Sequence, residues 1–403
     1  MRKGKCHLLR IICAYSLWFF FAGCKERFEP DLPSVNTNYL VIEGIINNGP
    51  GETQLKLTRT IPFSAQNRTL TPELKAQVQI ESESNVIIPI SEKGLGLYST
   101  QNLNLNPALK YRLRIKTAAG KEYLSDYVQV KKTPALDNIE WEEINNGVQV
   151  YVNTHDSENN TRYYKWEYEE TWEYVSQEET NLRWNGSQVV PRLPNETVYR
   201  CWGQGGSNNI LLGSSAKLTQ DIIYRQTLVF IPAGSLKLTQ LYSILVKQSA
   251  LTREAYDFLQ NMRKNTETLG SFFDPQPSEI KGNIHNVADP AEPVIGFFTI
   301  GNIVEKRIFI ARTELKEWED PRYECREHFI VNHPDSMKWY FDGLAPIPYP
   351  KYVDPVGGLV DQTKPCCKYI PVKGIDGGWR SVIDVCADCT TRGGKTIKPD
   401  FWP

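Results

Sequence analysis

After residue 38 the chain contains short stretches in which apolar and polar residues alternate. Leu55 and Leu57 fall on one face of such a stretch, and Val78 and Ile80 fall on one face of another. Alternation with a period of two predicts strands that bury one face. Turn-forming clusters, such as Asn-Asn-Gly-Pro-Gly at 47–51, separate these stretches, and no helical period appears. We therefore predict a mainly β protein whose N-terminal domain, residues 38–134, is an Ig-like or transthyretin-like β-sandwich.

The alternation resumes after this domain and predicts a second, larger β-rich domain over residues 135–319. Asn-Asn-Gly at 145–147 is a strong signal for a hairpin. The stretch 162–174 is dense in tyrosine and tryptophan, which suit a half-buried strand. Further strands are expected at 221–232, 240–249, 294–303 and 306–312.

One helix interrupts the β pattern near residues 252–265. Ala255, Phe258 and Met262 recur there at helical spacing, and Thr252 stands where an N-cap is needed. The helix should therefore bury one apolar face against the second domain.

The first 23 residues differ from the rest, because a basic start leads into 12 uncharged residues, Ile11 to Ala22. A membrane-spanning helix needs about 20 apolar residues, so this order predicts a secretory signal peptide at 1–23. The cysteine that follows Ala-Gly is similar to the bacterial lipobox, in which that thiol is acylated. We predict lipidation at Cys24 and a polar tether at 24–37, with an unlipidated secreted chain as the alternative.

The last region, residues 320–403, is rich in Pro, Gly and Cys and has little periodicity. Six cysteines follow Cys24, and an even number in an exported chain favours disulfide bonds. The candidates are Cys201, Cys325, Cys366, Cys367, Cys386 and Cys389. We therefore interpret 320–403 as an extension that disulfides staple to the second domain.

The pairing of these cysteines is left open by the sequence. Two bridges from Cys366 and Cys367 to Cys386 and Cys389 would leave a long-range link from Cys201 to Cys325. A zinc site is the alternative, because Cys386 and Cys389 have the spacing of a half-site. Adjacent thiolates reach one ion poorly and an oxidising compartment favours bridges, so we expect disulfides and no metal.

Composition and motifs argue against several classes of function. Residues 1–23 contain four basic side chains and no acidic ones, so the rest of the chain has 42 basic and 47 acidic residues. This balance, without a basic stripe, argues against nucleic acid as a partner. No His-Glu-x-x-His, Gly-x-Ser-x-Gly or phosphate-loop motif occurs. We predict neither an enzyme nor a cofactor.

Three tryptophans are our candidates for ligand binding. Trp172, Trp184 and Trp202 lie in or beside a polar, turn-rich stretch at 175–221, where we expect exposed rings. Trp166 alternates with charged neighbours on its strand and is expected inside the core.

The order of several motifs resembles a known family. They are Tyr39-Leu-Val-Ile-Glu-Gly44, Leu57-Thr-Arg-Thr60, Tyr163-Tyr-Lys-Trp166, Thr171-Trp-Glu-Tyr174, Leu251-Thr-Arg-Glu-Ala-Tyr256, Phe273-Asp-Pro-Gln-Pro277, Cys386-Ala-Asp-Cys389 and Lys398-Pro-Asp-Phe-Trp402. Together they resemble the Bacteroidota envelope lipoproteins labelled domain of unknown function 4249. That family has no established activity, and its members are commonly encoded beside TonB-dependent receptors. The resemblance implies a surface accessory role and supplies no catalytic residue.

We therefore expect a non-enzymatic outer-membrane lipoprotein that partners a TonB-dependent receptor in nutrient uptake. We expect it at the cell surface, with a periplasm-facing position as the alternative. One alternative is an adhesion or envelope-structural protein, which a loss of attachment on gene deletion would favour. Another is a hydrolase with an unrecognised site, which a deep pocket holding carboxylates or histidines of perturbed pKa would favour.

Overall fold

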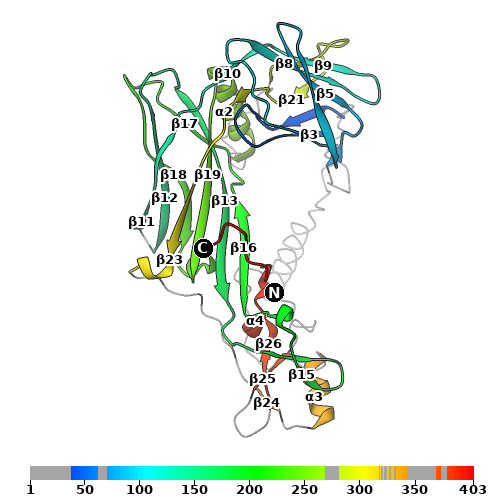
Figure 1. The fold of residues 1–403 in the computed structure, drawn as a ribbon, viewed down its shortest axis with the longest axis vertical. Coiled ribbons are helices and arrows are strands. Elements are labelled where there is room, and N and C mark those ends of the chain that lie inside the picture. The colour runs from blue at the N-terminus through cyan, green and yellow to red at the C-terminus, as the bar shows by residue number, and fades with distance from the viewer. Residues whose placement is uncertain are drawn as a thin grey trace, which may run out of the picture.

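The computed structural model describes residues 38–61, 70–144, 146–267, 281–316, 318, 321, 325, 328–330, 333–342, 369–373 and 379–403. The fold is mostly β, as the alternation predicts. Along its longest axis a curled sheet (the first unit), a β-sandwich (the second unit) and a small C-terminal region follow one another (Figure 1). The predicted signal peptide and tether, Cys24, Cys366 and Cys367 lie outside the described residues.

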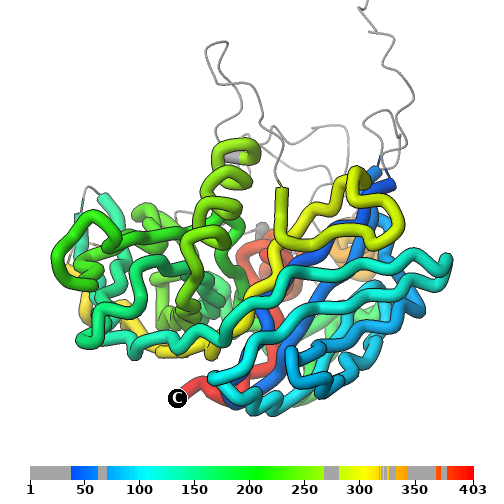
Figure 2. Tube along the Cα trace, turned by 90° about the horizontal axis from the view of Figure 1, so that it is seen from above, coloured from blue at the N-terminus to red at the C-terminus, as the bar shows by residue number. Residues whose placement is uncertain are grey.

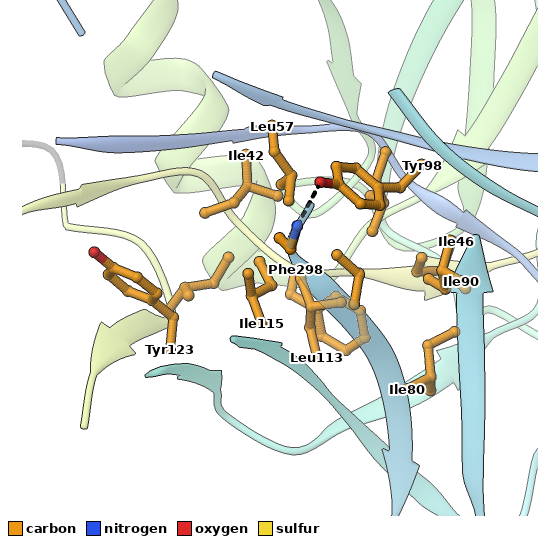
Figure 3. Close-up of a cluster of buried hydrophobic side chains, with 14 of the residues drawn as sticks. Ile42, Ile46, Leu57, Ile80, Ile90, Tyr98, Leu113, Ile115, Tyr123 and Phe298 are labelled. Atoms are coloured by element: carbon orange, nitrogen blue, oxygen red, sulfur yellow. Dashed lines mark hydrogen bonds between the residues drawn. The ribbon is translucent and has the colours of Figure 1, made fainter. Parts of the chain in front are cut away.

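The first unit is a 13-stranded sheet that curls around one apolar core. Its N-terminal strands are β1 (Leu40–Glu43), β2 (Ile46–Asn47), β3 (Glu52–Arg59), β4 (Thr71–Pro72), β5 (Gln77–Ser82), β6 (Ile87–Gly94), β7 (Leu97–Gln101), β8 (Lys110–Lys116), β9 (Glu122–Ser125) and β10 (Val128–Lys131). Leu57, Ile80 and Ile115 are fully buried in this core, where side chains from several strands meet (Figure 3). Alternate residues of each strand supply the core, which is why the period of two was visible in the sequence.

Three strands of the first unit come from much later in the chain. They are β20 (Ile284–Asn286), β21 (Val294–Ile295) and β22 (Ile300–Gly301). β21 pairs with β1, β22 pairs with β2 and β10, and β20 pairs with β9. Our assignment of a strand at 294–303 to the second domain is therefore wrong. Figure 2 shows this yellow segment running beside the blue and cyan strands.

The second unit is a sandwich of two sheets. One sheet has the order β11 (Leu136–Ile144), β12 (Gly147–Asp156), β18 (Asp221–Pro232). The other joins β16 (Arg200–Gly206), β13 (Tyr163–Val175), β19 (Leu241–Ala250) and β23 (Val304–Ala311), with β17 (Leu211–Ser214) also paired to β13. The inner faces of both sheets share one core, in which Tyr164 and Trp166 are fully buried. Burial of Trp166 confirms our prediction, as does the β11–β12 hairpin.

Smaller elements connect these strands. They are β14 (Leu182–Trp184), β15 (Val189–Pro191) and the short helical turns η1 (Pro194–Glu196), η2 (Leu236–Leu238) and η3 (Arg312–Glu314). The predicted helix is α2 (Arg253–Glu267). The hydroxyl of Thr252 accepts a hydrogen bond from the backbone N–H of Ala255 at 3.2 Å, so Thr252 is the N-cap as predicted.

The C-terminal region contains a three-stranded sheet of β24 (His328–Ile330), β26 (Trp379–Ile383) and β25 (Tyr369–Lys373). α3 (Pro334–Phe341), α4 (Asp384–Ala387) and η5 (Cys389–Arg392) accompany it. The final residues return to the second unit, where the buried indole of Trp402 donates to Glu173 at 2.9 Å.

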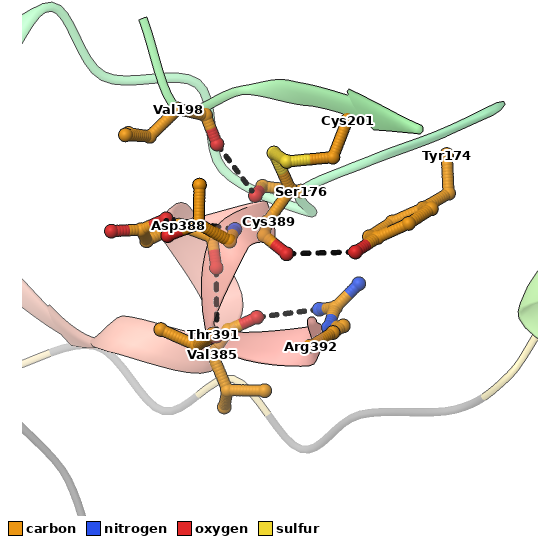
Figure 4. The surroundings of a disulfide bond; sticks show 10 residues. Tyr174, Ser176, Val198, Cys201, Val385, Asp388, Cys389, Thr391 and Arg392 are labelled. Carbon is orange, nitrogen blue, oxygen red and sulfur yellow. Dashed lines mark hydrogen bonds between the residues drawn. A yellow bond between two sulfur atoms is a disulfide. The ribbon is translucent and has the colours of Figure 1, made fainter. Parts of the chain in front are cut away.

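Among the described cysteines two disulfides staple this region, but with different partners from those we proposed. Cys201 bonds to Cys389 and Cys325 bonds to Cys386. A link from Cys201 to Cys325 is therefore wrong, and Cys386 and Cys389 do not form a zinc half-site. Figure 4 shows the first bridge joining β16 to η5, beside Tyr174. The spacing of the cysteines in the sequence could not predict this pairing, because it depends on a tertiary contact between β16 and η5.

Candidate functional site

A cleft of about 870 Å³ opens where the first unit meets α2 and the second unit. We call it the interunit cleft. Its walls come from β8 and β10 of the first unit, from the start of β13, from α2 and from residues 281–283. Ligand sites often lie at such junctions, because each unit supplies one wall.

The α2 wall carries charged side chains at the start of the helix. The guanidinium of Arg253 lies 3.7 Å from the carboxylate of Asp257, one turn further on. Hydrogen bonds from its own backbone N–H and from Thr252 lower the pKa of Glu254. The contacts favour the carboxylate form, whose negative charge also complements the positive end of the helix.

The opposite wall belongs to the first unit and carries lysine and tyrosine. Lys110, Lys131 and Tyr127 line it, and the Tyr127 ring is exposed beneath the guanidinium of Arg112, at 5.0 Å. A guanidinium over an aromatic face is attractive, so Arg112 holds this ring in place.

The remaining lining is aromatic and hydrogen-bonding. Tyr163 packs on Tyr256 with 5.0 Å between ring centres, and Phe258 packs on Phe297 at 5.4 Å. Arg162 donates to the backbone oxygens of Leu218 and Thr219, which fixes it at the rim. The cleft therefore combines apolar ring surface with charges of both signs.

Hydrogen bonds join the chain segments where they cross between the units. The Thr133 hydroxyl donates to the backbone oxygen of Asn302 and accepts from the Ala250 N–H, while the Thr133 N–H donates to the Asn302 side chain. Nearby, the Asn283 side chain exchanges two hydrogen bonds with the backbone of Phe298, at 2.7 and 3.0 Å. We call the Thr133, Asn302 and Ala250 contacts the crossing clasp.

The three candidate tryptophans do not gather on an open surface. Trp202 is 7% exposed, so our expectation of exposure is wrong for it. Trp184 is half-buried, packs on Phe341 and donates to Asp342 at 2.7 Å. Trp172 is half-buried between Gly203 and the ammonium of Lys237, which lies 5.2 Å from its ring centre. None of the three lines the interunit cleft.

Two buried polar clusters lie inside the second unit. Glu170 is 3% exposed and accepts hydrogen bonds from Lys237 and Tyr242. Elsewhere Asp221 accepts from Tyr164 and from Ser215. Burial, together with the neighbouring carboxylate, raises the pKa of each tyrosine. Each cluster satisfies its own donors and acceptors, which is what a structural polar group in a core requires.

Among the described residues, no cluster of three or more His, Cys, Asp and Glu side chains has the arrangement of a metal site. His155 is exposed and hydrogen-bonded to Asp137, and this contact raises its pKa. Within the same described part of the chain, no helix has the length and hydropathy needed to cross a membrane.

Comparison with known families decides the membership of the chain. The family described as a domain of unknown function, DUF4249, matches residues 25–307. The chain belongs to the DUF4249 family. The DUF4249 match spans every residue that lines the interunit cleft, whereas Cys325, Cys386 and Cys389 lie beyond it. Among curated proteins no significant match to this DUF4249 chain was found.

The cleft itself was not foreseen from the sequence. Its lining comes from separate segments, such as 126–131, 160–163 and 251–261, and each is unremarkable alone. The local signals that fell in this site were those of the helix: the Thr252 cap, which fixes where α2 begins, and Phe258, which recurs at helical spacing.

Proposed function

We propose that this DUF4249 protein is a non-enzymatic lipoprotein of the outer-membrane surface that binds a small polar solute for a TonB-dependent receptor. The interunit cleft is the observation that supports the proposal most. Its volume, about 870 Å³, falls in the range of small-molecule sites. Acyl chains on Cys24 would keep the cleft close to a receptor in the same membrane.

The lining indicates what such a solute would look like. Tyr163 and Phe297 offer ring surface, while Lys131, Arg162 and Glu254 offer charged hydrogen-bonding groups. Rings of this kind pack on the apolar faces of a ligand, and the charged groups orient its polar edge. A hydroxylated solute that carries an ionised group fits this lining better than a purely apolar one.

Filling the cleft tests the role of the site. Asn261 is exposed on the cleft side of α2, so Asn261→Trp would occupy the space where a solute binds. We expect this variant to fold and reach the membrane, but to slow growth on the nutrient whose uptake depends on the gene. Lys264→Trp, on the same helix outside the lining, is the matched control. Equal growth of the Asn261→Trp and wild-type strains would argue against solute binding in the cleft.

Two further measurements test the anchor and the partner. Mass spectrometry of the mature N-terminus is expected to find acyl chains on Cys24. Affinity purification from solubilised outer membranes is expected to recover a TonB-dependent receptor in a fixed ratio. An unmodified Cys24 would contradict the proposed acyl anchor. Purification that recovers no receptor would contradict the proposed partner.

A further inference from the structure

The turn between β6 and β7 presents a leucine to solvent in an unfavourable backbone conformation. Gly94, Leu95 and Gly96 have φ angles of 98°, 52° and 76°, and Leu95 is 85% exposed. A large side chain adopts positive φ only at a conformational cost. Asn or Gly would adopt the backbone conformation of this turn with less strain. Neither folding nor solubility accounts for leucine here, so an apolar function at this position is the simpler explanation.

Two more exposed leucines lie at the same end of the first unit. Leu70 and Leu74 are 48% and 43% exposed and flank the short strand β4. β4 contacts the Leu95 turn, because a Cβ added to Gly96 would lie 3.1 Å from the side chain of Pro72. We call Leu70, Leu74 and Leu95 the leucine face.

The described chain also begins at this end. The guanidinium of Arg59, at the end of β3, donates to the backbone oxygen of Asn38 at 3.2 Å. Two residues earlier on β3, the N–H of Leu57 donates to the oxygen of Gly96 at 2.8 Å. Asn38 and the Leu95 turn therefore lie next to residues of β3 that are two positions apart. Cys24 stands 14 residues before Asn38, and 14 residues reach at most about 50 Å when fully extended.

Lysines and carboxylates both lie beside the leucine face. Lys75 and Lys93 are exposed beside it. Of the nearby carboxylates, Glu73 pairs with Arg59 at 2.6 Å and Glu92 accepts the backbone N–H of Lys75 at 2.8 Å. Exposed lysines flanking apolar side chains suit a bilayer surface that carries anionic headgroups.

We propose that the leucine face is a membrane-contact surface, at which Leu95 enters the apolar boundary of the bilayer and the two lysines meet lipid headgroups. The inference rests on the proposed acyl anchor at Cys24, which brings this end of the body to the membrane. Contact there turns the first unit toward the bilayer and fixes how the rest of the molecule projects from it. The bilayer suits isolated leucines at a loop tip better than a protein partner, whose interface needs a broader apolar patch.

Hydrogen exchange tests the contact on the full mature protein. The acylated chain is reconstituted into phosphatidylethanolamine vesicles that contain phosphatidylglycerol, and it is compared with the unacylated Cys24→Ser chain in solution. We expect exchange at residues 93–97 to slow by about tenfold on vesicles, because removing one leucine from water shifts partitioning by at least that factor. Residues 84–88, at the other end of β6, should exchange equally in both states.

Matched variants separate the possible outcomes. Leu95→Ser should abolish the slowing, whereas Ile87→Ser, which alters an exposed residue at the opposite end of β6, should leave it intact. Unchanged exchange at 93–97 in a chain shown by mass spectrometry to be acylated would overturn the contact and leave the anchor standing. Slowing that appears only after outer-membrane proteins are added would assign the face to a protein partner and overturn the membrane proposal.

Discussion

At the scale of single residues, the packing of Trp172 depends on Gly203, which has no side chain. Its ring lies flat against β16 because Gly203 leaves room for it. A Cβ added to Gly203 would lie 2.3 Å from the indole Cε2, a separation that real structures do not tolerate. The strand and the ring therefore depend on each other, and Lys237 covers the other side of the ring.

Gly203→Ala should destabilise the protein by about 1–3 kcal/mol, because the methyl group overpacks this site. Chemical denaturation measures the loss of unfolding free energy. Trp172→Ala in the same chain removes the clash, so the double variant should lose less than the two single variants added together. Strictly additive losses would show that the ring and the glycine do not interact.

At the scale of elements, Glu292 ties the loop between β20 and β21 to β9. Its carboxylate accepts hydrogen bonds from Lys121, Tyr123 and Asn286 at 2.6 to 2.8 Å. Burial alone would raise the pKa of Glu292, but these hydrogen bonds outweigh burial and lower it. The ionised form is therefore favoured by folding.

A lowered pKa fixes the pH range in which Glu292 stabilises the fold. Its contribution is complete above about pH 4.3, the ordinary pKa of glutamate, and is lost as pH falls through the lower folded value. The melting temperature of wild type should therefore fall more steeply below about pH 4.3 than that of Glu292→Gln. Glu43→Gln changes an exposed glutamate and serves as the control. Parallel curves for wild type and Glu292→Gln would contradict this prediction.

The bridge from Cys201 to Cys389 joins two elements that are 188 residues apart in sequence. Replacing both cysteines with alanine should cost about 2–5 kcal/mol, since a bridge across a long loop restricts the unfolded chain most. Removing Cys325 and Cys386 instead opens a separation of 61 residues and should cost about 1 kcal/mol less. Calorimetry on both variants measures the difference, and an equal or reversed order would count against the chain-entropy explanation.

The elements themselves were largely predictable, whereas their partners were not. Alternation along 53–59 or 76–81 reports which face of a strand is buried, and it needs no knowledge of neighbours. The segment 294–303 is apolar enough to be expected as a strand, yet nothing local shows that its ends pair with β1, β2 and β10. The disulfide pairing was predicted wrongly and the interunit cleft was not predicted, for the same reason. Both depend on contacts between segments that are distant in the sequence.

At the scale of the whole molecule, the crossing clasp joins the first and second units. Thr133 is 4% exposed and its hydroxyl serves two backbone groups, on Asn302 and Ala250. Valine has the same shape but makes neither hydrogen bond, so Thr133→Val leaves two buried polar groups without their partner. We expect a loss of about 1–3 kcal/mol in the coupling of the units.

The positions of the tryptophans allow the coupling of the two units to be measured directly. The first unit contains no tryptophan in residues 38–134 or 281–303, so tryptophan fluorescence reports on the rest of the molecule. Circular dichroism reports on all strands. In wild type the two signals should change together on adding urea, and in Thr133→Val they should separate. Thr219→Val, at an exposed position, is the control, and coincident curves for Thr133→Val would show that the clasp does not couple the units.

The late arrival of β20, β21 and β22 has a consequence for how the chain acquires its shape. A ribosome delivers residues in order, and N-terminal domains usually fold first. Here the opening sheet lacks its later partners for β1, β2 and β9 until every strand of the intervening sandwich except β23 has been made. A nascent chain therefore carries exposed strand edges for most of its synthesis, and it gains a closed first sheet only when the segment ending at Gly301 returns to it.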